Sequence, residues 1–207
     1  MINYNLQAFK QIVLDASNNF EAAHFKNFIS KENLPSWPDF LNCIYEEWQQ
    51  PTDNDLASIV AGTGNNENLT GTVIVGKNLY INALNGIDNG PYVEEKFKKY
   101  FPEIFKMSVE LEQGSGVSIN LAGPKVCVGP YQSMSHKDSW SAFSLQCQGQ
   151  SLWTLSDKYL MEEDSIKYKK TFEMNPGDFL FFPEGMYHQI EISAPRASLQ
   201  FRTWFNK

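Results

Sequence analysis

Two of the chain's three histidines stand where they could bind a metal ion. His136 is followed two residues later by Asp138, and His188 lies much further along the chain. Residues i and i+2 of a β-strand point to the same face, so His-x-Asp at a strand directs an imidazole and a carboxylate into one cavity. A second histidine from a later antiparallel strand completes a 2-His-1-carboxylate set, which is typical of Fe(II) sites with open coordination positions. The pattern predicts a metal site at His136, Asp138 and His188.

The residues before His188 favour this interpretation. Asn175–Asp178 (Asn-Pro-Gly-Asp) is a turn that leads into the apolar segment Phe179–Phe182, and Pro183–Gly185 bends the chain before His188. The alternative is that both histidines are ordinary core or surface residues. We favour the metal site because the chain has so few histidines; the third, His24, is predicted to be structural.

The segments that must position these residues are short and apolar from about residue 107 onward. They show no helical period, and turn residues rich in glycine and proline separate them. The predicted strands are Val109–Leu111, Val117–Leu121, Lys125–Val128, Ala142–Cys147, Ser151–Leu155, Thr171–Met174, Phe179–Phe182, His188–Ile192 and Ser198–Phe205. So many strands in roughly 100 residues predict an all-β sandwich or barrel, not alternating strands and helices.

The N-terminal half is predicted to be mostly helical. Apolar residues at three- and four-residue spacing from Leu6 to Ala16 form one face of an amphipathic helix. A second helix runs from Ser36 toward Trp48, and a third spans Glu94–Phe105. The other predicted elements are a strand pair, Thr72–Gly76 with Leu79–Leu84, a short strand within Phe25–Ile29, and a loop over 61–71.

Composition narrows the class of protein. The 207 residues carry 17 basic and 24 acidic side chains, a net charge of −7, and 42% of them are apolar. These values indicate a folded chain and argue against a protein that tracks nucleic-acid phosphates. The segment Met1–Leu6 lacks the layout of a signal peptide, and no apolar run reaches the ~20 residues that span a bilayer. We expect a cytoplasmic protein.

The cysteines are few and widely spaced. Cys43, Cys127 and Cys147 are odd in number and form no Cys-x-x-Cys pair, so we expect buried reduced thiols. Neither a linker nor an internal repeat divides the chain. We therefore predict a single domain, 1–207, in which a mostly helical part, 1–106, packs on a β core, 107–207.

The motifs of the β half resemble those of the JmjC/cupin-like oxygenases that depend on 2-oxoglutarate and Fe(II). The similar segments are His136–Trp140, Leu145–Leu155 and Pro176–Pro183 with the following His188, and the resemblance covers about residues 107 to 205. Phe25–Ser30 and Trp37–Leu41 are more weakly similar to the family's N-terminal lead-in. The resemblance implies a double-stranded β-helix (jelly roll) with flanking helices, Fe(II) as the metal and 2-oxoglutarate as the co-substrate.

The resemblance also implies roles for individual residues. His136, Asp138 and His188 are the expected iron ligands. Ser133 matches a position where many members place a hydroxyl on the co-substrate carboxylate, and Arg202 resembles an arginine that follows the last histidine in some members. The remaining residues expected near the pocket are Lys125 and Asn120, with Tyr131 and Trp140 as candidate substrate contacts.

One position departs from the family pattern. Members usually have lysine or arginine about fifteen residues after the first metal ligand, to pair with the distal carboxylate of 2-oxoglutarate; this chain has Ser151 there. A buried dicarboxylate needs a cationic or multiply donating partner. The candidates are Arg202, Lys125 and Arg196. We favour Arg202 because its planar group binds carboxylates through two parallel hydrogen bonds.

The expected activity is an oxygenase reaction, by analogy the hydroxylation of an amino-acid side chain in a peptide or protein. We expect the substrate to be a peptide, a protein or a small molecule, and we expect no nucleic-acid or membrane partner. The protein is expected to be a monomer or a homodimer. One alternative is a cupin metalloprotein that does not use 2-oxoglutarate, either a dioxygenase or an isomerase, which Ser151 favours. Another is a non-enzymatic module that binds a ligand through Trp140, Trp153 and Trp204.

Overall fold

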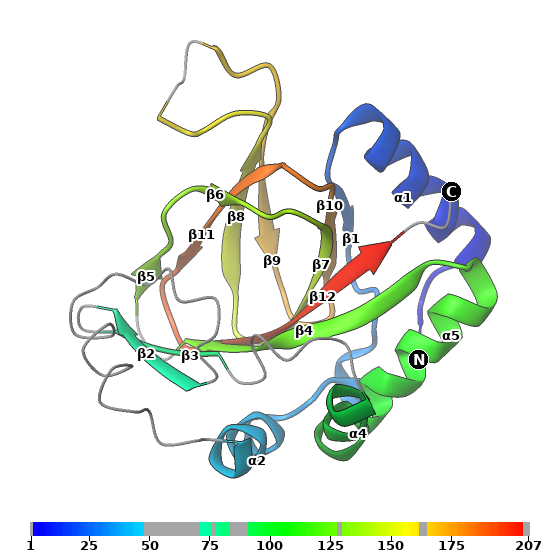
Figure 1. Cartoon of the computed structure of the whole chain (residues 1–207), viewed down its shortest axis with the longest axis vertical. Coiled ribbons are helices and arrows are strands. Elements are labelled where there is room, and N and C mark those ends of the chain that lie inside the picture. The colour runs from blue at the N-terminus through cyan, green and yellow to red at the C-terminus, as the bar shows by residue number, and fades with distance from the viewer. Residues whose placement is uncertain are drawn as a thin grey trace.

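Two antiparallel β-sheets lie face to face at the centre of the molecule (Figure 1). The structure, a computed structural model, describes residues 2–47, 71–75, 78–82, 91–127, 130–161 and 165–204. The larger sheet has seven strands, in the spatial order β1 (Ala23–Phe25), β10 (Phe179–Phe182), β7 (Ser141–Gln148), β12 (Arg196–Trp204), β4 (Ser118–Cys127), β3 (Asn78–Asn82) and β2 (Gly71–Val75). The smaller sheet has the order β5 (Tyr131–Gln132), β11 (Tyr187–Ile192), β8 (Ser151–Ser156) and β9 (Lys169–Met174), and β6 (His136–Lys137) also pairs with β11.

The strands of the C-terminal half pass back and forth between the sheets. Strands β7, β10 and β12 belong to the larger sheet, whereas β8, β9 and β11 belong to the smaller one. This arrangement is the predicted mainly-β jelly roll. The predicted pair of strands in the N-terminal half is also confirmed, because β2 and β3 are antiparallel neighbours that extend the larger sheet through β4.

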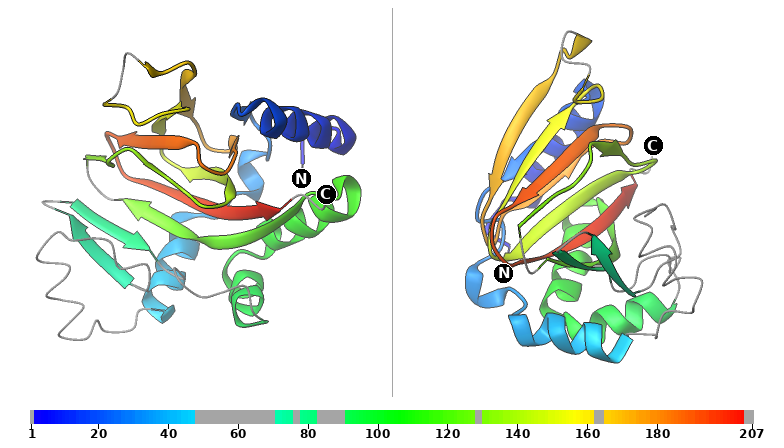
Figure 2. Two further views of the ribbon diagram at one scale, coloured as in Figure 1. Left: turned by 45° about the horizontal axis from the view of Figure 1, so that its top comes forward. Right: turned by 90° about the vertical axis from the view of Figure 1, so that its left-hand side faces the viewer.

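The helices cover the outer face of the larger sheet (Figure 2). They are α1 (Leu6–Asn19), α2 (Trp37–Glu47), α4 (Pro91–Tyr100) and α5 (Pro102–Ser115), with a 3₁₀ turn at Lys31–Asn33. Phe9 and Val13 of α1 and Leu111 of α5 are fully buried in one apolar cluster with strand residues such as Phe143 and Phe179. The rings of Phe143 and Phe179 stack with centroids 4.6 Å apart. Burial of these aromatic side chains therefore joins helices to sheet.

The inner face of the same sheet is apolar at β10, where Leu180 and Phe182 pack against the smaller sheet, and polar along part of β7 and β12. Gln146 on β7 accepts a hydrogen bond at its Oε1 from the Ser151 hydroxyl on β8, 2.8 Å away in the opposite sheet. Alternate residues of a strand share a face, so Ser144 also faces inward; its hydroxyl accepts a bond from Gln200 Nε2 at 2.8 Å. The space between the sheets is therefore lined with hydrogen-bonding groups at this depth.

The N-terminal segment connects the two sheets. Strand β1 pairs with β10 of the larger sheet, and the preceding Ala22 donates its backbone N–H to the Tyr168 hydroxyl at 2.9 Å, just before β9 of the smaller sheet. The buried Asp178 carboxylate accepts bonds from the backbone N–H of Asn27 at 2.8 Å and of Asn175 at 3.0 Å, and lies 3.2 Å from His24 Nε2. His24 is thus structural, as predicted.

Glycine is required where these segments approach closely. Gly177 has a φ of +98°, and a Cβ there would lie 2.5 Å from the carbonyl oxygen of Ile29. The Ile29 N–H donates to the Gly177 carbonyl at 3.1 Å. A side chain at residue 177 would separate this contact, which explains the Pro-Gly-Asp turn of the sequence.

Three sequence-based predictions were wrong in detail. Val109–Leu111, predicted as a strand, lies within α5, whose buried residues Ile104, Met107 and Leu111 follow helical spacing. The β core therefore begins after this helix and not at residue 107. The predicted helix Glu94–Phe105 is two helices, because the chain turns at Phe101 and Pro102 begins α5.

The third error concerns β4. Val117–Leu121 and Lys125–Val128 were predicted as separate strands, but Ser118–Cys127 is one strand beside β12. A register shift between Gln200 and Phe201 accommodates an extra residue on β4, so the Gly-Pro sequence bends the strand without ending it. The predicted loop 61–71 lies outside the described residues except at Gly71. All three cysteines are buried, as expected, and none of the described helices is long and apolar enough to cross a membrane.

Replacing Asp178 tests the connection between β1 and the turn before β10. Burial works to raise the pKa of this carboxyl, but the bonds from His24, Asn175 and Asn27 outweigh it and lower the pKa. Asp178→Ala leaves buried donors unsatisfied, so we expect a loss of about 3 kcal/mol in the free energy of unfolding at pH 7. Because the folded-state pKa is depressed, this contribution is lost as the pH falls through that pKa.

Urea unfolding at pH 7 measures the effect. The control is Asp15→Ala, which removes an exposed carboxylate that accepts from Gln11 on the same helix and should change stability by no more than about 0.5 kcal/mol. Equal losses in the two variants would contradict the assignment.

Candidate metal centre

Strand pairing brings the three predicted metal ligands together. Strand β6 begins at His136 and pairs with β11 so that His136 lies directly opposite His188. Asp138 follows β6 by one residue, and ligand atoms of the three side chains all lie within 4.8 Å of one another. The turn that precedes β11 is fixed to the same segment, because Gly185 donates its N–H to the Asp138 carbonyl at 3.0 Å.

Both imidazole rings are oriented by backbone carbonyls. His136 Nδ1 lies 3.0 Å from the Met134 carbonyl oxygen, and His188 Nδ1 lies 3.2 Å from that of Met186. A carbonyl oxygen only accepts, so each Nδ1 carries the hydrogen and each Nε2 keeps its lone pair. Such bonds fix the tautomer and direction of metal-binding histidines. Two oriented Nε2 atoms and a carboxylate fit a divalent iron of the facial-triad type.

The two histidines differ in their surroundings. His136 is exposed, whereas His188 is 3% exposed and lies against Phe182 and Trp153, with ring centroids at 4.7 and 5.9 Å. The pKa of His188 is lowered to about 4, chiefly by desolvation and also by the nearby His136, while Asp138 partly offsets both. His188 is therefore neutral at pH 7, the state in which imidazole binds a metal. The site has a dry wall at His188 and an open side at His136.

Ser151 and Ser133 have hydrogen-bonding roles within the protein. The buried Ser151 hydroxyl donates to Gln146 Oε1 and accepts from Trp153 Nε1 at 3.1 Å. The Ser133 hydroxyl accepts the backbone N–H of Ile190 at 2.9 Å and so fixes the β5–β6 connection to β11. Each hydroxyl lies on a strand or segment next to the histidines, but Ser151 is four residues along β8 from Leu155, the residue opposite His188.

The basic candidates lie on the inner side of the larger sheet. Arg202 packs its guanidinium over the Trp140 ring, 4.1 Å from the centroid, and its Nε is buried without a hydrogen-bond partner among the described residues. Arg196 is fully buried and donates from Nη1 to the Ser198 hydroxyl at 2.7 Å. The Lys125 ammonium is close enough to Asp138, Arg196 and Arg202 for their charges to act on it.

The remaining predicted site residues are Trp140, Asn120 and Tyr131, and the structure gives side-chain contacts near the metal centre only for Trp140. Trp140 is two residues after Asp138 and contacts Arg202. Asn120 lies opposite Arg202 on β4. Tyr131 is placed by its backbone opposite Ile192 on β11, but its side chain lies outside the described part of the chain.

Sequence analysis missed the polar inner face. Gln146 and Gln200 connect the interior serines: Gln200 Nε2 donates to Ser144 and, at 3.2 Å, to Ser198. The signal was present in the alternation of apolar and polar residues along β7 and β12, which predicts one apolar and one polar face for each strand. These polar groups lie on the face of the larger sheet that is directed toward the smaller sheet.

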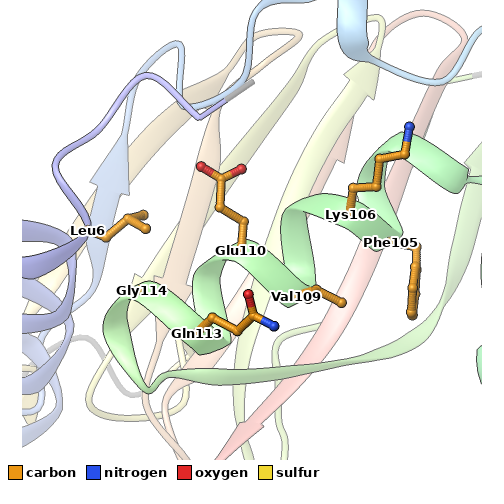
Figure 3. A pocket seen from close by; sticks show the side chains of 7 residues that line it. All are labelled: Leu6, Phe105, Lys106, Val109, Glu110, Gln113 and Gly114. Carbon is orange, nitrogen blue, oxygen red and sulfur yellow. The ribbon is translucent and has the colours of Figure 1, made fainter.

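A cavity of about 530 Å³ lies elsewhere, between the start of α1 and α5 (Figure 3). Its walls include Leu6, Val109 and Gln113, and none of the predicted site residues. It is on the outer, helix-covered side of the larger sheet, so it is not the candidate metal centre.

Metal titration tests the site directly. We expect one Co(II) or Fe(II) per chain, and His136→Ala or His188→Ala should weaken affinity by at least about 10-fold to 100-fold because a ligand is lost. The matched control is His24→Ala. His24 also lies beside an aspartate, Asp178, but at the contact between β1 and the turn before β10, away from the three candidate ligands. Unchanged affinity in the His188 variant, or an equal loss in the His24 variant, would contradict the assignment.

The stability of the metal-free protein should depend on Lys125. Burial lowers the pKa of this lysine to about 7, and Arg196 and Arg202 lower it while Asp138 raises it. Between pH 7 and 9 the unfolded chain therefore binds more protons at this residue, and stability rises with pH. The rise from Lys125 is on the order of 2 kcal/mol, and urea unfolding at several pH values measures it.

Lys125→Met is the comparison, since it removes only this titration. The upper limit of pH 9 avoids an effect of Cys147. Burial raises the pKa of this thiol, so its titration lowers the stability of the fold only above the ordinary pKa of cysteine. If the free energy of unfolding changed with pH in the same way in the wild type and in Lys125→Met, the lowered pKa of Lys125 would be refuted.

One comparison with known protein families agrees with the motif resemblance. Residues 117–206 match the family model of the JmjC domain, which confirms the JmjC/cupin-like resemblance of this segment; it contains β4 to β12 and all three candidate metal ligands. No curated protein matches the sequence. A similar solved structure is that of hydroquinone 1,2-dioxygenase PnpCD in complex with Cd²⁺ and 4-hydroxybenzonitrile, with 15% identity and a TM-score of 0.32 over 41% of this chain. The matched region is 58% of that protein's chain, less than two thirds of its length.

Proposed function

We propose that this protein is a non-haem Fe(II) oxygenase that uses 2-oxoglutarate and hydroxylates an amino-acid side chain of a peptide or protein. The observation that carries the proposal is the convergence of His136, Asp138 and His188, with both Nδ1 atoms bonded to backbone carbonyls. The JmjC domain match supports an oxygenase of this type. The peptide substrate rests on analogy with the family, since one fold supports many functions.

The bound group supplies the oxidising chemistry. Fe(II) together with a chelating 2-oxo acid activates O₂, so that the acid is converted to succinate and CO₂ while a substrate C–H becomes C–OH. In this protein, His136, Asp138 and His188 would hold the metal. The carbonyls of Met134 and Met186 hold the rings in the required direction, so the site needs little reorganisation on binding.

The surroundings separate a closed side from an open one. Phe182, Trp153 and Leu155 are buried around His188 and exclude water there. His136 is exposed, and the neighbouring Met134 is 81% exposed. A substrate of macromolecular size would therefore approach from the His136 side, where Trp140 and Tyr131 are candidate contacts.

The polar interior would take the co-substrate. Its two carboxylates need donors, and the inner face offers the cations Lys125 and Arg202. An apolar interior would exclude a dicarboxylate, because an uncompensated buried charge is very costly. Ser133, whose hydroxyl accepts the Ile190 N–H and donates to no partner among the described residues, is a further candidate contact.

Succinate formation without any added substrate tests the proposal. Purified protein with Fe(II), ascorbate and 2-oxoglutarate under air should produce succinate slowly, because many such reactions proceed without the prime substrate. Asp138→Ala should reduce the rate by at least about 100-fold, since it removes a metal ligand. His24→Ala is the control and should retain the wild-type rate.

The absence of succinate from the wild type, or succinate that Asp138→Ala leaves unchanged, would overturn the proposal. It would favour the second candidate, a cupin metalloprotein without 2-oxoglutarate. The observation behind that candidate is Ser151, a neutral residue at the position where the family usually has a cation. Its hydroxyl is bonded to Gln146 and Trp153. The third alternative, a binding module, has less support, because Trp153 is buried with its N–H bonded inside the barrel.

A further inference from the structure

We propose that Lys125 binds the distal carboxylate of the co-substrate. From the opposite sheet, it would take the role of the basic residue that family members usually have where this chain has Ser151. The inference rests on the proposed use of a 2-oxo dicarboxylic acid. It assigns the anion-binding role to β4 and not to Arg202, the residue that sequence analysis favoured.

Strand register places Lys125 at the depth of Ser151. Lys125 lies directly opposite Ser198 on β12, and Ser198 lies directly opposite Gln146 on β7. Directly opposed residues of antiparallel strands share a face. Gln146 faces the smaller sheet, because its Oε1 accepts the Ser151 hydroxyl. Lys125 and Ser198 therefore face the interior too, at the same level as Ser151.

Side-chain length explains why a lysine can act from this level. Ser151 lies four residues from the residue opposite His188, about 13 Å along the strand. A serine at that depth cannot approach a group bound near the metal, whereas a lysine can extend back toward it. The Lys125 ammonium is close enough to Asp138 for the two charges to interact.

The charges of the interior favour an anion at this place. Arg196 and Arg202 both act on Lys125, and desolvation lowers the pKa of Lys125 to about 7. A carboxylate placed among these cations would relieve their repulsion and form charge-assisted hydrogen bonds.

Arg202 is placed for a different contact. It lies opposite Ala142, at the end of β7 that follows Asp138, and not at the depth of Ser151. Its guanidinium is held against Trp140. The distal carboxylate of a chelated five-carbon acid points away from the metal, so Arg202 is beside the chelating end or the substrate.

Two ligands that differ only in the distal group test the assignment. Anaerobic titration of the Fe(II)-loaded protein with 2-oxoglutarate, or with 2-oxopentanoate, follows the charge-transfer absorbance that chelation produces. The second acid has the same five carbons but ends in a methyl group. The wild type should prefer 2-oxoglutarate by on the order of 100-fold, and Lys125→Met should reduce that preference by on the order of 10- to 100-fold while binding 2-oxopentanoate as well as the wild type does.

Control variants distinguish the charge from a general loss of structure. Lys125→Arg keeps a cation and should retain most of the preference for 2-oxoglutarate. If Lys125→Met does not fold, Lys125→Gln replaces it as the variant without the charge, and Lys125→Arg remains its control. Lys170→Met removes an exposed lysine that lies 3.8 Å from Glu21 and should change neither affinity. Arg202→Gln should leave the preference between the two acids intact.

Three results would overturn the inference: a Lys125→Met protein that keeps the preference, an Arg202→Gln protein that loses it, or Lys125 variants that weaken both acids equally. A wild type that binds Fe(II) but neither acid would instead refute the proposed function. The two failures are therefore distinguishable in one set of titrations.

Discussion

The pairing of β6 with β11 is the constraint on which the rest of the site depends. It places His136 opposite His188, with ring centroids 4.2 Å apart, and Asp138 follows within two residues. Two imidazole rings and a carboxylate gain little from such proximity by themselves. Their arrangement is fixed by backbone bonds to Met134, Met186 and Asp138, so the backbone supplies the preorganisation that a metal ion requires.

The larger sheet serves two purposes because its faces differ. Its outer face is apolar and binds α1 and α5 through stacked phenylalanines, which supplies the hydrophobic stabilisation of the fold. Its inner face carries Gln146, Gln200 and Lys125. Alternation along each strand makes this possible, since every second residue can serve the core and every other residue the interior. The proposed co-substrate site thus needs no additional structural element.

The convergence of the candidate metal ligands could be predicted from the sequence, because His-x-Asp, and later a second histidine after a turn and a buried strand, form a recognisable pattern. The jelly roll followed from the number and spacing of the apolar segments. The choice of Lys125 over Arg202 and Arg196 as the proposed anion-binding residue could not be made from the sequence, because it depends on the register between β4, β12 and β7. That register includes the shift between Gln200 and Phe201, which no count of residues between motifs reveals. Likewise, Val109–Leu111 has strand-like composition, and only the burial of Ile104 and Met107 on the same face identifies it as helix.

A crystal structure of the anaerobic complex with Mn(II) and 2-oxoglutarate tests the account most directly. The account predicts Mn(II) at about 2.0–2.3 Å from His136 Nε2, His188 Nε2 and an Asp138 oxygen, with both Nδ1 atoms still bonded to the carbonyls of Met134 and Met186. The distal carboxylate should lie within hydrogen-bond distance of Lys125 Nζ. A metal bound through Nδ1 or away from these three residues would contradict the account, and so would a distal carboxylate held by Arg202 without Lys125.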